Sequence, residues 1–166
     1  MKKILFILIG ITLAIQVSSQ EKPRVAILDP TISGMLDDGI KVTVREIISS
    51  SIIKIGTHNI VERSLLEKVM AEQQFSNSGV VDESQATEIG KLSGASKVIV
   101  SVITKFSEEE RMLSIKMIDV QTATIEKQDY KIVEKEKLIK IVKPMTLKVF
   151  KPKKPSIISK IKEKIH

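Results

Sequence analysis

The feature that most constrains the fold is a run of apolar residues over 97–105. Its core reads Val-Ile-Val-Ser-Val-Ile, which is typical of a strand buried on both faces at the centre of a sheet. Residues 112–120 then alternate apolar and polar side chains, as a half-buried strand does. Residues 125–133 follow after a second short turn. We therefore predict an antiparallel meander of three strands.

The N-terminal half predicts strands that alternate with helices. Residues 24–28 form a short apolar run closed by Asp29-Pro30, as expected of a buried strand that ends at a turn. Residues 58–62 predict a second strand. Between the two strands, apolar side chains recur at the spacing of one helical face, which comprises Leu36, Ile40, Val44, Ile47 and Ile48. We expect this helix to end in the region 49–56, which holds three serines and a glycine.

Two further helices are predicted by capping signals. Ser64 is followed three residues later by Glu67, and Asp82 by Gln85, which is the spacing of a capping box. Gly94 is placed to end the second of these helices, because glycine readily adopts the left-handed conformation found after a helix C-terminus.

These segments follow one another in the order β-α-β-α-α-β-β-β. The order predicts an α/β fold, specifically an α+β sandwich in which helices pack on a mixed β-sheet. We place this domain at residues 20–135. Beyond it, we expect a short helix before Pro144, an edge strand over 146–150 and a linker over 151–155.

The first 19 residues have the pattern of a cleaved export signal. Lys2 and Lys3 precede an apolar run over 4–17, and residues 17–19 supply a signal-peptidase site. Removal of the signal would leave 147 of the 166 residues, enough for one domain. The chain has no cysteine, which excludes disulfides, thiol catalysis and the lipid-bearing cysteine of a lipoprotein. We therefore expect an exported, periplasmic protein that is not a lipoprotein.

Positive charge is concentrated at the C-terminus. Residues 131–166 carry twelve lysines against three glutamates, whereas residues 20–130 carry 13 basic and 17 acidic side chains. A basic extension over 136–166 includes a predicted amphipathic helix at 156–165, formed by Ile157, Ile158, Ile161, Ile165, Lys160, Lys162 and Lys164. This stretch suits an anionic membrane surface or an acidic partner, and a flexible solubilising tail stays open as the alternative. Export, and the lack of aromatic residues among the lysines of residues 151–166, argue against nucleic acid.

The chain offers few groups for catalysis. His58 lies in a predicted strand and His166 is the last residue, and no HExxH, GxSxG or GxxxxGK[ST] spacing is present. We predict no cofactor, no metal site and no enzymatic activity. A charged cluster at the end of the second strand predicts a structural ion pair or helix cap, formed by Glu62, Arg63, Ser64 and Glu67.

Four segments carry a family resemblance: residues 25–29, 60–67 with Glu72-Gln73, 86–95 and 118–122. In this order and spacing they resemble the CsgG family, the curli production assembly/transport component, and more broadly its LpoB and TolB N-terminal relatives. The resemblance implies a periplasmic domain of anticodon-binding-domain-like architecture. It also implies a protein that works by association with envelope proteins, or with copies of itself, and not by catalysis.

Three departures indicate that the chain keeps this domain without the family's export pore. No cysteine follows the leader, and only residues 31–35 stand where the pore formers have a long constriction loop. The turns at 107–111 and 121–124 are too short to hold a membrane hairpin. We therefore predict a soluble periplasmic module for protein interaction or assembly. A subunit of a curli-like outer-membrane secretion channel, and a peripheral membrane protein that uses its basic tail, stay open as alternatives.

Overall fold

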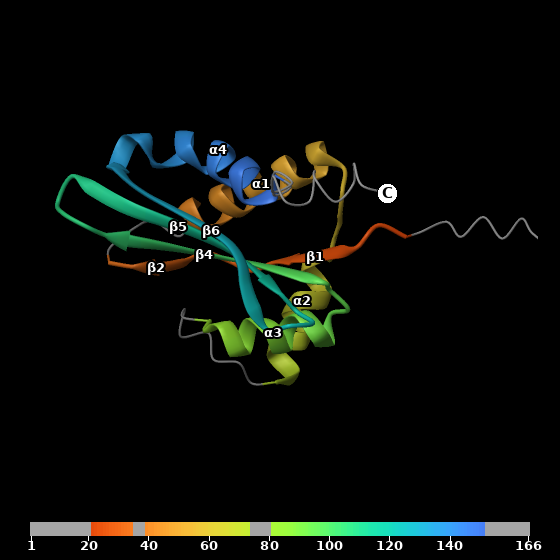
Figure 1. Ribbon diagram of the computed structural model, residues 1–166. Helices are drawn as coiled ribbons and strands as arrows, with labels where there is room; N and C mark the ends of the chain where they lie inside the picture. The colour runs from red at the N-terminus through yellow and green to blue at the C-terminus, as the bar shows by residue number, and fades with distance from the viewer. Residues whose placement is uncertain (1–20, 35–38, 74–80, 152–166) are drawn as a thin grey trace, which may run out of the picture.

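A computed structural model describes residues 21–34, 39–73 and 81–151. These residues form one mixed sheet of six strands with helices on both of its faces (Figure 1). The elements are β1 (Arg24–Ile27), β2 (Thr31–Ser33), α1 (Gly39–Ile55), β3 (Asn59–Ile60), α2 (Arg63–Glu72), α3 (Glu83–Leu92), β4 (Lys97–Lys105), β5 (Glu110–Asp119), β6 (Thr124–Glu134), the short 3-10 helix η1 (Lys135–Lys137) and α4 (Leu138–Phe150).

The strands lie in the order β3-β1-β4-β5-β6, and β2 continues beside β4 after β1 ends. β1 is parallel to both β3 and β4, while β4, β5 and β6 form the predicted antiparallel meander. The apolar run predicted at the sheet centre is β4, and it is buried on both faces. Ile99 and Ile103 are buried on one face of the sheet, and Val98 and Val100 are buried on the other. The predicted mixed sheet with packed helices is confirmed.

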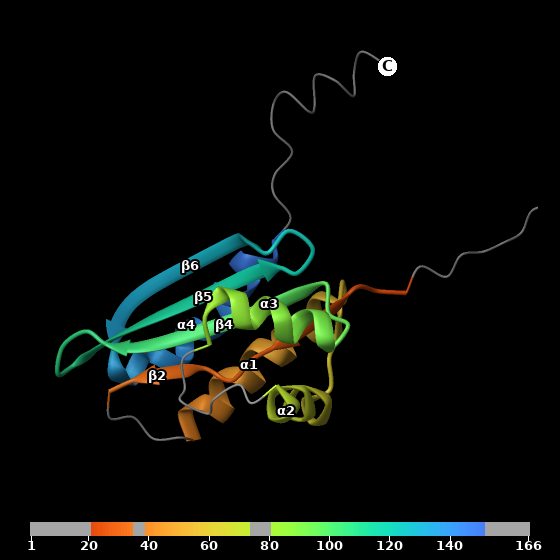
Figure 2. The same ribbon diagram turned by 90° about the horizontal axis from the view of Figure 1, so that it is seen from below.

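Helices cover the two faces in pairs, which gives the domain two cores. α1 and α4 lie on one face, and α2 and α3 lie on the other (Figures 1 and 2). The first core is the larger and consists of Val25, Ile27, Val44, Ile48, Ile52, Ile99, Ile103, Leu113, Ile115, Met117, Leu138, Val142, Met145 and Val149. The second lies under α2 and α3 and includes Ala26, Leu28, Leu66, Val69, Ala86, Ile89, Val98 and Ile118.

Helix α1 extends through its three serines and ends at Ile55, within the predicted region 49–56. The hydroxyl of Ser51 donates to the carbonyl of Ile47 at 2.6 Å, so it is satisfied within the helix. Burial of Val44, Ile48 and Ile52 against the sheet stabilises the helix through the turn that holds the serines. Gly56 follows the helix with a φ of 74°, the left-handed conformation that glycine adopts most easily. Leu36 of the predicted face lies outside the described residues.

Helix α4 corrects the sequence-based prediction for the C-terminal part. The edge strand predicted over 146–150 is wrong, because residues 138–150 form a single helix with Pro144 inside it. Proline removes a backbone donor and normally breaks a helix. Here it lies on the exposed side, while a stripe at helical spacing is buried in the first core, comprising Leu138, Val142, Met145 and Val149. Burial outweighs the cost of the proline, and the packed body extends to Phe150 instead of ending at residue 135.

The predicted export signal, and the isoleucine and lysine residues predicted to contact a membrane or a partner, lie outside the described residues. Those contact residues are Ile157, Ile158, Ile161, Ile165, Lys160, Lys162 and Lys164. Among the residues that the structure describes, no helix combines the length and the apolar character needed to cross a membrane.

Gly90 sets how closely α3 approaches the sheet. A Cβ at this position would lie 2.6 Å from methyl groups of both Val98 and Val120. We expect Gly90→Ala to lower the free energy of unfolding by about 1–2 kcal/mol, because overpacking costs more than the better helix propensity of alanine returns. Chemical denaturation measures this, with the exposed neighbour Lys91→Ala as the control. Equal stability of Gly90→Ala and the wild type would contradict the close packing of α3 against β4 and Val120.

Candidate interaction site

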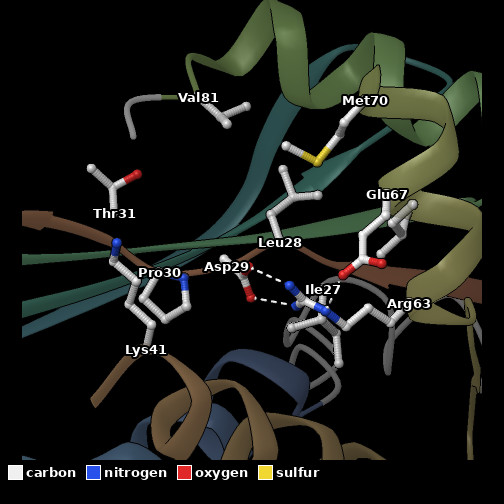
Figure 3. A pocket seen from close by; sticks show the side chains of 11 residues that line it. Ile27, Leu28, Asp29, Pro30, Thr31, Lys41, Arg63, Glu67, Met70 and Val81 are labelled. Atoms are coloured by element: carbon white, nitrogen blue, oxygen red, sulfur yellow. Dashed lines mark hydrogen bonds and ion pairs between the residues drawn. The ribbon is translucent and has the colours of Figure 1, made fainter. Parts of the chain in front are cut away.

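A hollow of about 270 Å³ opens where β1 ends, between α2 and the start of α1. Figure 3 shows charged side chains on one side of it and apolar side chains on the other. It is lined by Ile27, Leu28, Asp29, Pro30, Thr31, Lys41, Arg63, Leu66, Glu67, Met70 and Val81. The topology explains its position, because β1 and β3 are parallel neighbours and their carboxyl ends meet at the same edge of the sheet.

Arg63, the first residue of α2, joins two carboxylates on the charged side. Its Nη1 and Nη2 donate to Oδ1 and Oδ2 of Asp29 at 2.7 and 2.8 Å, a bidentate pair (Figure 3). Its Nε donates to Oε1 of Glu67, one helical turn further on, at 2.7 Å. These hydrogen bonds, that to Asp29 above all, raise the pKa of Arg63 above its ordinary value. The guanidinium is therefore held in one fixed orientation, while the Arg63 side chain as a whole remains 45% exposed.

Asp29 is shared between two helices. Besides Arg63, it accepts a hydrogen bond from Nη1 of Arg45 on α1 at 2.8 Å, and Arg45 also contacts Glu46. A residue at the end of a strand thus ties the first turn of α2 to the middle of α1. We call these charged residues, Asp29, Arg45, Arg63 and Glu67, the rim of the hollow. Because its acids and bases balance, the rim offers paired hydrogen-bonding groups and not a strong net charge.

The other side of the hollow is apolar. Leu28 and Leu66 are buried at its base, and Met70 and Val81 are half-buried at its margin. In Figure 3 the thioether of Met70 lies close to Leu28, between the strand and the helix. Methionine is flexible and polarisable, so it adapts to differently shaped apolar groups. The hollow therefore suits an amphipathic guest, such as a peptide segment that buries one apolar side chain and presents polar main-chain groups to the rim.

The four residues predicted to form an ion pair or a cap have different roles in the structure. Arg63 does form ion pairs, with Asp29 and with Glu67. The capping box predicted from Ser64 and Glu67 is wrong: Glu62 is the N-cap, without a side-chain capping bond, and Ser64 lies inside the helix. By contrast, the capping box of Asp82 and Gln85 is confirmed in full.

Sequence reasoning missed Asp29, which precedes Arg63 by 34 residues. A usable signal was present, because two adjacent parallel strands bring the residues that follow them together. Asp29 follows β1 and the pair Glu62-Arg63 follows β3, so pairing these two strands in the prediction would have placed the acid beside the arginine.

A second hollow, of about 480 Å³, lies at the opposite ends of the same strands and includes His58, Lys97 and Asp119. Nζ of Lys97 donates to Asp119 at 2.5 Å and to Glu126 at 2.6 Å. Burial first, and then the positive charge of Lys97, lower the pKa of His58. The imidazole packs edge-on against Phe150 at a centroid distance of 5.6 Å. The histidine is thus a partly buried packing residue, and across the described residues no group of three His, Cys, Asp or Glu could hold a metal ion.

The ion pair between Lys97 and Asp119 predicts that the stability of the fold depends on pH. Hydrogen bonds from Lys97, and then from the backbone N–H of Thr122, lower the pKa of Asp119 from 3.8 to about 2. Because the folded-state pKa is depressed, the ionised carboxylate stabilises the fold above pH 4, and this contribution is lost as the pH falls toward 2. We expect Asp119→Asn to be less stable than the wild type at pH 6 and the difference to shrink between pH 4 and pH 2 in thermal melts. If the difference in melting temperature between the two proteins stayed constant from pH 4 to pH 2, the lowered pKa of Asp119 would be contradicted.

Comparison with known proteins places this fold in a family. The family model for CsgG, the curli production assembly/transport component, matches residues 18–115, more than half of the chain. The chain therefore belongs to the CsgG family, as the resemblance predicted. The match covers β1 to the middle of β5 and so includes every residue that lines the first hollow. No curated protein sequence matches the chain.

Solved structures confirm the fold. The LpoB C-terminal domain from Escherichia coli is 17% identical with a TM-score of 0.56, over 78% of this chain and 93% of that one. The corresponding domain from Salmonella enterica is 16% identical with a TM-score of 0.56, over 72% and 87% of the two chains. Lipoprotein GNA1162 from Neisseria meningitidis is 6% identical with a TM-score of 0.51, over 86% and 92%. At these identities the likeness concerns the fold alone.

Proposed function

We propose that this protein is a non-catalytic interaction module of the bacterial cell envelope, and that it binds a partner protein through the hollow at the end of β1. Membership of the CsgG family, whose name describes assembly and transport of curli, supports an assembly role in the periplasm. The observation that carries the proposal is the fixed guanidinium of Arg63 beside the apolar wall of Leu66 and Met70. Interfaces concentrate their binding energy in such centres, where arginine and apolar anchors lie together.

The groups of the rim are ordered before any partner arrives. Arg63 is fixed by three hydrogen bonds, and Asp29 is held by two arginines, so little side-chain entropy remains to be lost on binding. Both side chains stay more than two-fifths exposed, which leaves lone pairs and N–H groups for the main chain of a partner. The same ion pairs occupy the carboxylates of Asp29 and Glu67, which is a poor arrangement for general acid or base catalysis.

Capture from native envelopes tests the proposal. The tagged full-length protein would be cross-linked in whole cells and purified under denaturing conditions, beside two variants. Met70→Glu puts a charge on the apolar wall, whereas Lys140→Glu changes an exposed residue of α4 on the other face of the sheet. We expect Met70→Glu to lose at least nine-tenths of the partner recovered by the wild type, and Lys140→Glu to retain it. Equal recovery by Met70→Glu, at an unchanged melting temperature, would refute this use of the hollow.

A further inference from the structure

We propose that two copies of this protein pair through β6, antiparallel and about a twofold axis at Tyr130, so that their sheets become continuous. This surface is separate from the hollow at β1, because β4 and β5 lie between the two strands. The dimer therefore deepens the assembly role proposed above but does not depend on which partner the hollow binds.

β6 is a long strand at the border of the sheet. It spans 11 residues and, in the part of the chain that the structure describes, pairs with β5 alone. Figure 2 shows its outer side running along the edge of the sheet, uncovered by α2 and α3. An edge of this length presents a row of unpaired N–H and C=O groups to another strand. Such an edge can be blunted by proline, a short strand, a bulge or charged side chains. β6 has no proline and is long, and its bulge lies near its beginning, so the segment after the bulge is free of these backbone interruptions.

The ladder with β5 shows which residues face outward. The N–H of Lys135 donates to the carbonyl of Glu109 at 2.8 Å, so this pair is hydrogen-bonded within the sheet. Because the pattern alternates in an antiparallel ladder, the main-chain groups of Gln128, Tyr130 and Ile132 point away from β5. A symmetric pair of β6 strands would therefore bond through these three residues, with its twofold axis at one of them or at one of the intervening residues, 129 or 131.

The bulge in β6 selects among these centres. The register shifts between Met117 and Ile118, whose partners are Lys127 and Ile125, so β6 is regular only from Lys127 onward. Tyr130 lies at the middle of the regular segment from 127 to 134. Gln128 lies at its beginning, and Ile132 lies too near its end to pair as many residues.

On the face of β6 that α4 covers, the side chains fit a pairing centred on Tyr130. It places Asp129 of each copy opposite Lys131 of the other. Asp129 Oδ1 accepts from Lys148 at 2.5 Å, while Oδ2 is buried and has no hydrogen-bond partner among the described residues. Lys131 is exposed. Pairing supplies a cation beside each carboxylate, whereas a centre at residue 129 or 131 would put lysine against lysine.

The opposite face contributes apolar area. Tyr130 is 65% exposed and Ile132 is 40% exposed, beside the half-buried Met112 of β5. In the proposed register, Tyr130 meets its own symmetry mate and Ile132 meets Gln128. Cross-strand pairs of aromatic and branched residues are the units that stabilise sheets, so a surface that one copy leaves in water becomes the middle of a wider sheet.

A single introduced cysteine tests the register, because the chain has none of its own. Residues opposite each other in a hydrogen-bonded pair have Cα atoms about 5.5 Å apart, within disulfide range. On mild oxidation of the full-length protein, we expect Tyr130→Cys to form a covalent dimer and Gln128→Cys to form at least tenfold less, because it is offset by four residues from its mate. Cross-linking of Gln128→Cys in place of Tyr130→Cys, or of neither, would overturn the proposal.

Sedimentation equilibrium supplies an independent readout on the protein without cysteine. Lys131→Glu places an acid opposite Asp129, and we expect it to weaken the dimer at least tenfold, while Lys140→Glu leaves the dissociation constant unchanged. A wild-type protein that stays monomeric at every concentration would refute the dimer even if capture through the β1 hollow succeeds.

Discussion

A chain that ends at residue 135 is expected to be unfolded, whereas one that ends at Lys151 is expected to fold as the full-length protein does. The shorter chain lacks α4, whose buried stripe of Leu138, Val142, Met145 and Val149 closes the first core. Full burial of each such side chain contributes about 1.5–3 kcal/mol. Together they approach the entire stability of a typical domain, about 5–15 kcal/mol. Circular dichroism and thermal unfolding of both chains measure the difference.

A point substitution separates loss of the helix from loss of its packing. Met145→Ala should lower the free energy of unfolding by about 2–5 kcal/mol, as deletion of large apolar side chains from a core does. Its neighbour Lys143 is exposed, and Lys143→Ala should change stability by less than about 0.5 kcal/mol. Cooperative unfolding of the chain that ends at residue 135, with the melting temperature of the longer one, would show that α4 is dispensable.

Arg63→Ala is expected to reduce capture of the envelope partner at least tenfold while it costs the fold only about 1 kcal/mol. The stability effect is small because Asp29 keeps its hydrogen bond from Arg45 and the pair is half-exposed. The binding effect is larger, because removal of the guanidinium leaves Asp29 and Glu67 less ordered on the charged side of the hollow. Quantified recovery after cross-linking, together with chemical denaturation, measures both effects.

Arg63→Lys distinguishes geometry from charge. Lysine keeps the positive charge but cannot form the bidentate pair with Asp29 or reach Glu67 at the same time. If the fixed orientation matters, Arg63→Lys should behave more like Arg63→Ala than like the wild type. Full capture by Arg63→Lys would assign the effect to charge alone, and full capture by Arg63→Ala would remove the arginine from the interface.

The layers of the fold were predictable where hydrophobic periodicity was unambiguous. β4 stands out because its short, β-branched apolar run is typical of a strand buried on both faces, and the alternation in β5 and the short turns on either side of it then predict a meander. The prediction failed at α4, where Pro144 and several β-branched residues favour a break or a strand locally. The helix forms because its apolar stripe faces a core built by residues far away in the sequence, which no local pattern shows.

The candidate site shows the same division between local and distant information. The ion pairs of Arg63 follow from its position at the end of β3, but the partner Asp29 comes from a different strand and is found only through the parallel pairing of β1 and β3. The sequence pattern at Ser64 was misleading, since Arg63 is drawn into the first turn of α2 by Asp29 and Glu67. The helix therefore begins one residue before the predicted cap.

Site-specific photo-cross-linking in living cells tests the central proposal most directly. A photoreactive amino acid would replace Met70 in the hollow and, in a matched strain, Lys140 on α4. Partner binding at the β1 hollow predicts a discrete cross-linked species of higher mass from position 70, absent from position 140 and lost when Arg63→Ala is added. Absence of a species from position 70, or the same species from both positions, would contradict the proposal.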